Sequence, residues 1–265
     1  MINKFEFKFE LGKNLYERIP LSSLSGGLIM KGSKPDNEEI ILGGGRTTTG
    51  VVRIGNTVRK PVKKNSEYAR QVLQFLERKH FKHSQRYRGK DEENREIFAY
   101  VEGFIPADLG DTTDIQLQSF MKIVREFHDI SQDFVKSDTL VLCHDDLSPC
   151  NVVFRDDRPI AIIDWNDVHP DERWQDLTYI LWLWINIGSH YENKNIVSQM
   201  RSALNAYGAD ETTKHDFANK LIKRMNRVLT ETDKSRKDYE KIKEWVQYSI
   251  RWVEKNKIAI QNEIG

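Results

Sequence analysis

Short apolar runs separated by turn residues dominate the chain between about residues 40 and 61. The run Ile40–Leu42 is followed by a loop of small residues over 43–50, and the apolar pattern resumes at Val51–Ile54. A Gly-Asn turn signal then leads into Thr57–Pro61, where the proline ends the strand because it has no amide hydrogen to donate. This pattern predicts three antiparallel strands in a meander, with a glycine-rich turn between the first two.

The apolar positions change to a helical period after the meander. A helix capped by Ser66 is predicted, with one apolar face formed by Ala69, Val72, Leu73, Phe75 and Leu76. The later run Ile97–Val101 predicts a buried strand, broken soon afterwards by a glycine and a proline. We therefore expect residues 1–101 to form an amino-terminal extension and lobe, and residues 102–265 a second lobe; residues 22–39 resemble an irregular connector, and no role is assigned to residues 1–38.

The second part of the chain begins with another amphipathic pattern. Its apolar positions Leu117, Phe120, Met121, Val124 and Phe127 recur at helical spacing. Three short apolar runs follow at Leu140–Leu142, Val152–Phe154 and Ile160–Ile163, separated by charged loops, and the pattern from about Arg173 onward is helical. The whole pattern predicts an α+β protein: a small antiparallel sheet with a helix, then a larger, mainly helical lobe.

The composition indicates which classes of partner and which cellular compartment to expect. With 41 basic and 40 acidic side chains, the overall charge favours neither nucleic acid nor an anionic membrane as a partner. Only two cysteines occur, at positions 143 and 150, which is typical of a reducing cytoplasm rather than of a disulfide framework. The most hydrophobic stretch, Tyr179–Ile187, is far shorter than the roughly 20 residues that span a bilayer. We expect a cytoplasmic protein and leave its oligomeric state open.

Three polar residues are placed where phosphoryl transfer would need them. Asp146 and Asn151 lie in one segment between two strand-like runs, and Asp164 ends the next run. A phosphotransferase needs a carboxylate beside the accepting hydroxyl and oxygen ligands that hold Mg²⁺ against the nucleotide phosphates. We predict that Asp146 is the catalytic base and that Asn151 and Asp164 bind the metal, because Mg²⁺ prefers hard oxygen ligands.

The spacing of these residues matches a known pattern. His144, Asp146 and Asn151 have the His-x-Asp-x-x-x-x-Asn spacing of the protein kinase catalytic loop, and the strand ending at Asp164 matches the one before the second metal-binding aspartate. With the segments 143–154, 163–165 and 174–177, the chain from about residue 40 resembles the aminoglycoside phosphotransferase and choline kinase-like family. The resemblance implies a protein kinase-like two-lobed fold, ATP or GTP with Mg²⁺ as cofactors, and a small-molecule hydroxyl as acceptor.

Two departures from protein kinases favour a small acceptor. Ser148 stands where those enzymes have lysine, and Asp164-Trp165-Asn166 replaces Asp-Phe-Gly. A protein Ser/Thr kinase-like enzyme and a nucleotide-binding pseudoenzyme scaffold stay as alternatives. The family often has glycine where this chain has Asp145, for which no role is assigned. Acidic residues after Asp164 make a cationic acceptor one candidate, although solvated surface loops are the simpler account of such residues: Asp167, Asp171, Glu172 and Glu192.

The resemblance also indicates residues for the nucleotide and for the support of the catalytic loop. It places a phosphate-binding loop at Gly43, Gly44 and Gly45 and an interlobe hinge at Tyr100 and Val101. It implies that His144 braces the catalytic loop and that Asp176 accepts hydrogen bonds from the amides of that loop.

One basic side chain is expected to reach the phosphates. Arg59 and Lys60 are neighbours on a strand, so only one of them can point into the cleft. The kinase pattern favours Lys60, with Arg59 as the reserve candidate. Glu67, the only acid in the first turns of the following helix, is the expected ion-pair partner of Lys60, although a solvated glutamate at a helix start is nearly as good an explanation.

Overall fold

A five-stranded antiparallel sheet forms the first half of the molecule. The computed structural model describes residues 38–42, 50–106, 112–188 and 195–264. The strand order is β1-β2-β3-β5-β4, and the strands are β1 (Glu39–Ile41), β2 (Val52–Ile54), β3 (Thr57–Lys60), β4 (Tyr87–Lys90) and β5 (Glu96–Ala99). The predicted meander is present. β4 was not predicted, because its sequence is polar and its side chains alternate only between half-buried and exposed.

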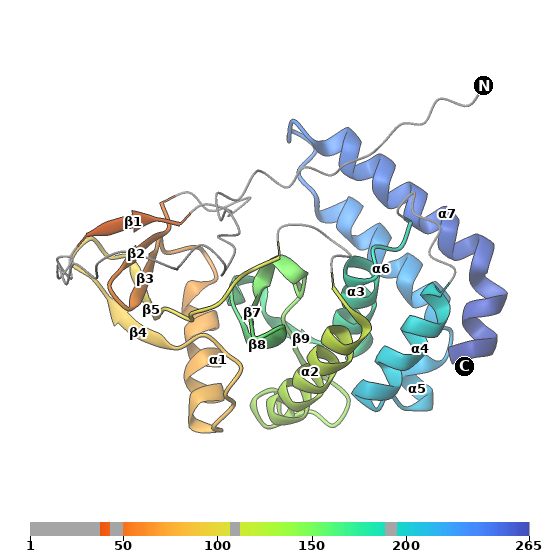
Figure 1. Cartoon of the computed structure of the whole chain (residues 1–265), viewed down its shortest axis with the longest axis horizontal. Coiled ribbons are helices and arrows are strands. Elements are labelled where there is room, and N and C mark those ends of the chain that lie inside the picture. The colour runs from red at the N-terminus through yellow and green to blue at the C-terminus, as the bar shows by residue number, and fades with distance from the viewer. Residues whose placement is uncertain (1–37, 43–49, 107–111, 189–194, 265) are drawn as a thin grey trace, which may run out of the picture.

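Helix α1 (Ser66–Arg78) crosses beside this sheet, as Figure 1 shows. The five apolar residues predicted for its inner face are all buried. The prediction of Ser66 as the cap was wrong, because Asn65 occupies the cap position and Ser66 is the first helical residue. The Ser66 hydroxyl instead accepts from the amide of Lys63 at 2.9 Å and donates to the carboxylate of Glu96 at 2.7 Å.

The second half begins with the long helix α2 (Asp114–Val135), which Thr113 caps with its side chain. Two antiparallel strand pairs follow. One joins β6 (Val141–Cys143) to β9 (His169–Asp171), and the other joins β7 (Val152–Arg155) to β8 (Arg158–Ile162). Three of these strands correspond to the predicted apolar runs, whereas β9 is a three-residue strand with a proline at its centre and shows no such pattern.

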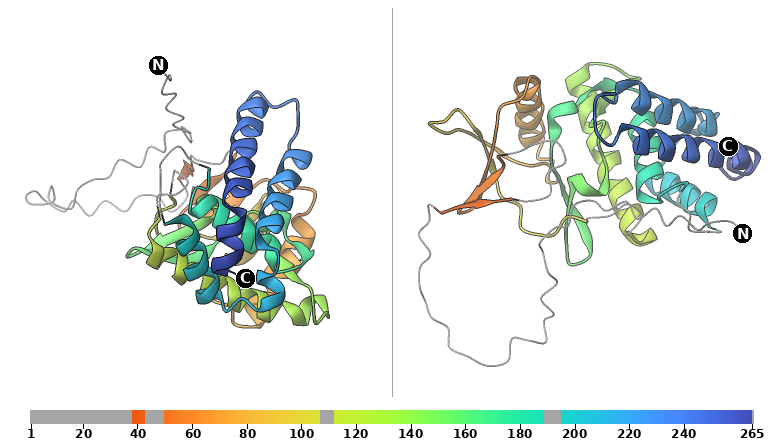
Figure 2. Two further views of the ribbon diagram at one scale, coloured as in Figure 1. Left: turned by 90° about the vertical axis from the view of Figure 1, so that its right-hand side faces the viewer. Right: turned by 90° about the horizontal axis from the view of Figure 1, so that it is seen from above.

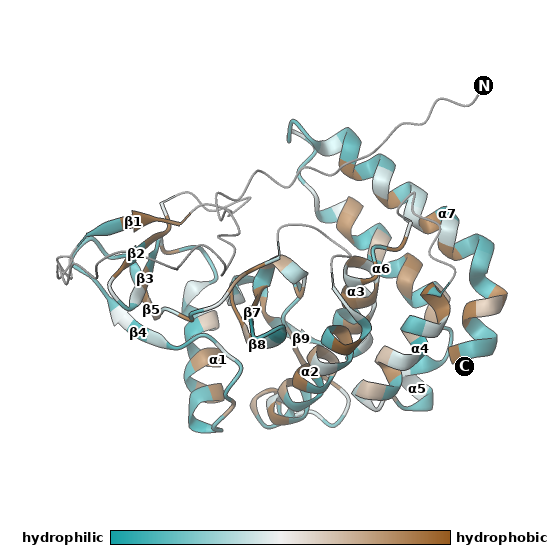
Figure 3. Cartoon of the chain, in the orientation of Figure 1, coloured by the Kyte–Doolittle hydropathy of each residue, from teal (hydrophilic) through white to brown (hydrophobic). Residues whose placement is uncertain are grey.

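In the described residues after β9, five helices follow and lie on the far side of the strand pairs from the sheet (Figure 1). They are α3 (Trp174–Trp184), α4 (Ile196–Tyr207), α5 (Glu211–Lys214), α6 (Phe217–Glu231) and α7 (Tyr239–Ile264). Apolar residues recur among hydrophilic ones along α1, α4 and α7 (Figure 3), as expected for helices with one face on a core. No helix in the described ranges combines the length and the apolar character needed to cross a membrane.

The two halves are joined by backbone hydrogen bonds. Ile162 in β8 donates to the carbonyl of His83 at 2.7 Å and accepts from the amide of Gln85 at 3.1 Å. Phe104 and Phe154 exchange two further bonds, at 2.9 and 2.8 Å. Figure 2 shows the resulting arrangement from above, with the sheet and α1 on one side and the helices on the other. The boundary at residues 101 and 102 stays a prediction, and the segment around residues 83–85 lies against the second half.

Candidate active site

The loop between β6 and β7 presents the carboxylate of Asp146. One of its oxygens, Oδ1, accepts from the hydroxyl of Tyr179 at 3.0 Å, and Oδ2 accepts from the side-chain amide of Asn151 at 2.8 Å. The indole of Trp184 donates to the carbonyl of Leu147 at 2.9 Å and so anchors the loop to α3. Both carboxylate oxygens are held in defined positions, as a positioned base requires.

Asp176, at the start of α3, supports the same loop through hydrogen bonds to its backbone. Its carboxylate is fully buried and accepts from the backbone amides of His144 and Asp145, both at 2.9 Å. These are the amide hydrogen bonds that the family resemblance implies. Burial alone would raise the pKa of Asp176, but the hydrogen bonds from the His128 side chain and from the His144 amide hold the pKa below its ordinary value.

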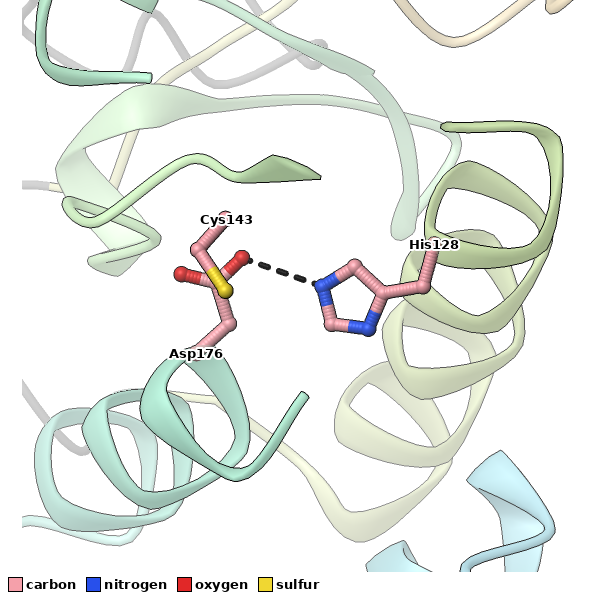
Figure 4. A group of neighbouring side chains, drawn as sticks. All are labelled: His128, Cys143 and Asp176. Atoms are coloured by element: carbon pink, nitrogen blue, oxygen red, sulfur yellow. Dashed lines mark hydrogen bonds and ion pairs between the residues drawn. The ribbon is translucent and has the colours of Figure 1, made fainter. Parts of the chain in front are cut away.

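Asp176 belongs to a buried group with His128 and Cys143, drawn in Figure 4, whose ligand-type atoms lie within 4.8 Å of one another. His128 already uses both ring nitrogens: Nε2 lies 3.1 Å from Asp176, and Nδ1 lies 2.8 Å from the hydroxyl of Tyr207. Burial raises the pKa of the Cys143 thiol well above its usual value, which keeps it protonated. We therefore interpret the group as a polar support for the catalytic loop.

His144 connects the catalytic loop to the end of β8. Its Nδ1 accepts from the amide of Asp146 at 3.4 Å, so Nε2 carries the proton and donates to the carbonyl of Ile163 at 3.0 Å. A second link runs from the amide of Ile163 to the carbonyl of Asn151 at 2.9 Å. These bonds position Asp164 beside the loop that contains Asp146 and Asn151.

Asp164 has a left-handed backbone, with φ of 61°, and its Oδ1 accepts from Lys60 at 2.6 Å and from Asn166 at 2.9 Å. Burial opposes its ionisation, but the charge of Lys60 holds the pKa of Asp164 below its ordinary value. The pKa of nearby Asp167 is raised by partial burial and by the carboxylates of Asp146 and Asp164. Three carboxylates are thus gathered at one end of the catalytic loop.

The donor set fits a hard divalent cation. In the described part of the chain, no hydrogen bond engages Asp164 Oδ2 or Asn151 Oδ1. The Asn151 nitrogen is committed to Asp146, which leaves the amide oxygen as the atom available to a metal. Oxygen atoms of this kind are the ligands that Mg²⁺ takes in proteins.

The two neighbouring basic residues of β3 point to opposite faces of the sheet. Lys60 is buried and pairs with Asp164, whereas Arg59 lies 3.6 Å from Asp91 on the other face. Lys60, not Arg59, therefore lies at the predicted metal ligand. The prediction of Glu67 as the partner of Lys60 was wrong for this state of the protein: Glu67 is exposed, and within the described residues Lys60 pairs with Asp164.

Only some of the other residues predicted to bind the nucleotide lie in the described part of the chain. Gly43, Gly44 and Gly45 lie outside the described residues. At the expected hinge, the amide of Tyr100 donates to the carbonyl of Asn56 at 3.0 Å and is already used within the sheet. Val101 follows directly after it, so its backbone is the better candidate for a hydrogen bond to a purine.

The charge of Asp145 is compensated by two arginine side chains. Its carboxylate lies 2.8 Å from Arg224 and 3.0 Å from Arg227, both on α6. Burial raises its pKa to about 6, and the two arginines act in the opposite direction. Arg224 also stacks 4.4 Å above the ring of Tyr179. Sequence reasoning missed Tyr179 and Arg224, since both lie in regular helical patterns that gave no functional signal.

Residues 135–211, which include the catalytic loop, match the model of a family described as the phosphotransferase enzyme family. The chain is 27% identical over 215 residues to the trifolitoxin immunity protein of Rhizobium leguminosarum bv. trifolii, covering 70% of this chain and 80% of that relative.

Solved structures that share the fold include two small-molecule phosphotransferases. The microcompartment-associated aminopropanol kinase has a TM-score of 0.63 at 13% identity, over 86% of this chain and 94% of that one. The ADP-bound aminoglycoside phosphotransferase APH(2'')-Ib has a TM-score of 0.52 at 13% identity, over 82% and 94%. The fold is thus the two-lobed α+β fold of protein kinase-like enzymes, and the resemblance to the aminoglycoside phosphotransferase and choline kinase-like family is confirmed.

Proposed function

We propose that this protein transfers the γ-phosphate of ATP or GTP to a hydroxyl group of a small molecule in the cytoplasm. The observation that carries the proposal is the carboxylate of Asp146, held by Tyr179 and Asn151 close to the Lys60–Asp164 pair. A base for the acceptor and a charged site for the donor phosphates are what phosphoryl transfer needs from a protein.

In this reaction Asp146 orients the acceptor hydroxyl and takes its proton as the oxygen attacks the γ-phosphorus. The bond between the γ-phosphorus and the bridging oxygen breaks, and its electrons leave with the nucleoside diphosphate. Mg²⁺, when bound, supplies charge neutralisation at the phosphates. The residues that would hold it are Asn151 and Asp164, and Lys60 would contact the phosphates.

The acceptor is proposed from chemistry and from the similar proteins. The two solved structures described above have names that refer to aminopropanol and to an aminoglycoside, which carry both amines and hydroxyls. The carboxylates of Asp146, Asp164 and Asp167 lie near one another, and a cationic acceptor would be attracted to such a group. We therefore propose an amino alcohol or aminosugar as the acceptor class.

Labelled γ-phosphate provides the test. The protein would be incubated with Mg²⁺ and labelled ATP or GTP, together with a panel of amino alcohols, aminoglycosides and a generic protein substrate. We expect label in a small amine-containing alcohol, and none with the Asp146→Ala variant. Label in the protein substrate alone would favour a protein kinase. Nucleotide binding without transfer to any acceptor, equal in both variants, would favour a scaffold.

A second candidate function is protection of a cell from a toxin. The observation that favours it is the 27% identity to a trifolitoxin immunity protein. Cells sensitive to trifolitoxin would be tested for survival when they produce this protein or its Asp146→Ala variant. Survival with the wild-type protein but not with the variant would make phosphoryl transfer the means of protection. Survival with both would indicate binding without catalysis. Survival with neither would reject this candidate.

A further inference from the structure

The carboxylate of Glu96 is an unexplained group inside the sheet. Glu96 lies on β5, directly opposite Lys60 of β3, and is only 2% exposed. Its Oε2 accepts from the hydroxyl of Ser66 at 2.7 Å, whereas its Oε1 is buried without a hydrogen bond in the described part of the chain. A buried carboxylate oxygen without a hydrogen bond is costly, so it needs a reason.

Lys60 and Glu96 share one face of the sheet. Directly opposite residues of antiparallel strands have Cβ atoms about 4.5–5.5 Å apart, which the long side chains of lysine and glutamate easily bridge. The ammonium of Lys60 also lies 6.0 Å above the ring of Phe98, two residues beyond Glu96 on the same strand. Both charged side chains line one small pocket, with Ser66, Arg70 and Asn166.

The acidic residue near Lys60 was expected on helix α1, but in the structure it lies on strand β5. The expected acid of α1, Glu67, is exposed, and the side chains of that helix that contact Glu96 are Ser66 and Arg70. Arg70 lies 3.7 Å from Glu96, too far for a hydrogen bond by usual criteria. The acidic residue at this place is therefore Glu96 of the sheet, and side chains of α1 contact it.

Lys60 cannot keep its present partner in every state of the reaction. It is paired with Asp164, the same carboxylate that is proposed to bind Mg²⁺. A divalent cation on that carboxylate would repel the ammonium group, which would then turn to the phosphates and to another anion in the pocket.

We propose that Glu96 is a positioning residue that holds Lys60 toward the nucleotide phosphates once metal and nucleotide are bound, so that Lys60 moves from Asp164 to the free oxygen of Glu96. This inference rests on the proposed function. Ser66 and Arg70 keep the Glu96 carboxylate in place before the exchange, and the acid that pairs with Lys60 comes from β5 rather than from α1.

The test is a double-mutant cycle read by calorimetric titration with Mg·ATP and, in parallel, Mg·GTP. Glu96→Gln should raise the dissociation constant about 10- to 100-fold, the range for losing a charged hydrogen-bond partner. In a Lys60→Ala background the same change should have less than about a 2-fold effect, since Glu96 acts through Lys60. Glu77→Gln, an exposed acid on α1, is the matched control and should change nothing.

Structural effects are separated by measuring thermal unfolding without nucleotide. Coupling between positions 60 and 96 should be large in nucleotide binding and small in unfolding, because Lys60 pairs with Asp164 when nucleotide is absent. If Glu96→Gln fails to fold, Ser66→Ala serves in the same cycle; it should weaken binding several-fold, again only when Lys60 is present.

Two results would overturn the inference. One is an equal effect of the Glu96 change with and without Lys60, and the other is a loss of affinity in Glu67→Gln that Glu96→Gln does not show. A wild-type protein that binds neither nucleotide would instead reject the proposed function, and this inference with it.

Discussion

Asp164 joins the proposed metal site to the proposed phosphate site, because its carboxylate already holds Lys60. We predict that Asp164→Asn lowers turnover by roughly 100-fold at ordinary Mg²⁺ concentration, since the amide lacks the charge that retains the cation. A Mg²⁺ titration should restore part of the activity. The same titration of Asp146→Ala should stay flat, because metal cannot replace a base, and recovery there would contradict the roles assigned to both residues.

Tyr179 is predicted to position the base. Its pKa is raised well above the ordinary value, first by burial and then by the charge of Asp146, so the hydroxyl stays a hydrogen-bond donor. Tyr179→Phe removes this one bond, and turnover should fall by about 10-fold, the equivalent of about 1.4 kcal/mol. Nucleotide affinity should not change. Steady-state kinetics beside a nucleotide titration measure the two effects, and a loss of affinity alone would be inconsistent with this role.

Among the helices, α6 is tied to the catalytic loop by the pairing of Arg224 with Asp145. Arg224 is 3% exposed, and Asp145 has a left-handed backbone with φ of 68°. Arg224→Met should destabilise the fold by about 3–5 kcal/mol, since it removes one partner of a buried ion pair. The double variant that adds Asp145→Gly should be more stable than Arg224→Met, because it also removes a carboxylate that has lost one of its two arginine partners and relieves the backbone strain.

Chemical denaturation of the single and double variants is the measurement. Asp145→Gly alone leaves Arg224 buried with one partner fewer and should also be destabilising. If the double variant were less stable than the wild type by the sum of the two single losses, the two residues would be independent and the pairing would contribute nothing.

The contact between α2 and α3 through His128 predicts a pH dependence of stability. Burial lowers the pKa of His128 from its ordinary value of 6.5, although Asp176 acts in the opposite direction. Below that value the unfolded chain binds a proton that the folded protein does not. Stability should therefore fall as the pH decreases through about 6.5, by up to about 1.4 kcal/mol per pH unit from this residue.

His128→Asn is the comparison for this effect, because asparagine does not titrate. The difference in unfolding free energy between wild type and variant should shrink as the pH falls from 7.5 to 5.5, while groups shared by both proteins cancel. Asp145 titrates in the same range with the opposite sign and is one of these shared groups. A difference that is constant with pH would show that His128 is not the cause.

For the molecule as a whole, the junction between the two halves depends on a close approach at Gly103. A Cβ atom there would lie 2.3 Å from the carbonyl oxygen of Phe154 and 2.6 Å from a methyl group of Val153. Gly103→Ala should destabilise the protein by about 1–3 kcal/mol through this overlap. Gly89→Ala is the control, because it also has a positive φ but its Cβ would meet nothing within 4 Å.

Thermal unfolding of both glycine variants tests this point. The extra loss in Gly103→Ala over Gly89→Ala reports the overlap, since both changes impose a similar backbone cost. Equal losses would mean that the junction can open without penalty and that the two halves are not held at this contact.

The local pattern of residues was enough to predict most elements and to propose the residues of the catalytic loop. The sequence predicted the apolar face of α1 and the three runs that correspond to β6, β7 and β8. This was possible because alternation and helical spacing follow from local geometry. Asp146, Asn151 and Asp164 could be selected because they lie within one stretch whose spacing is a property of the chain. The polar strand β4 and the proline-containing β9 could not be predicted in this way, because partners elsewhere in the fold define them.

Pairings between distant residues had to come from the folded protein. Lys60 and Asp164 are 104 positions apart, and no local spacing could show that Lys60 meets Asp164 while Glu67 stays at the surface. The same holds for Tyr179 on Asp146, for the two arginines on Asp145 and for Glu96 opposite Lys60. The sequence by itself determined which residue types occur in the short motifs of the site. The packing of helices and strands decided which charged side chains face one another, because side-chain interactions act only over a few ångströms.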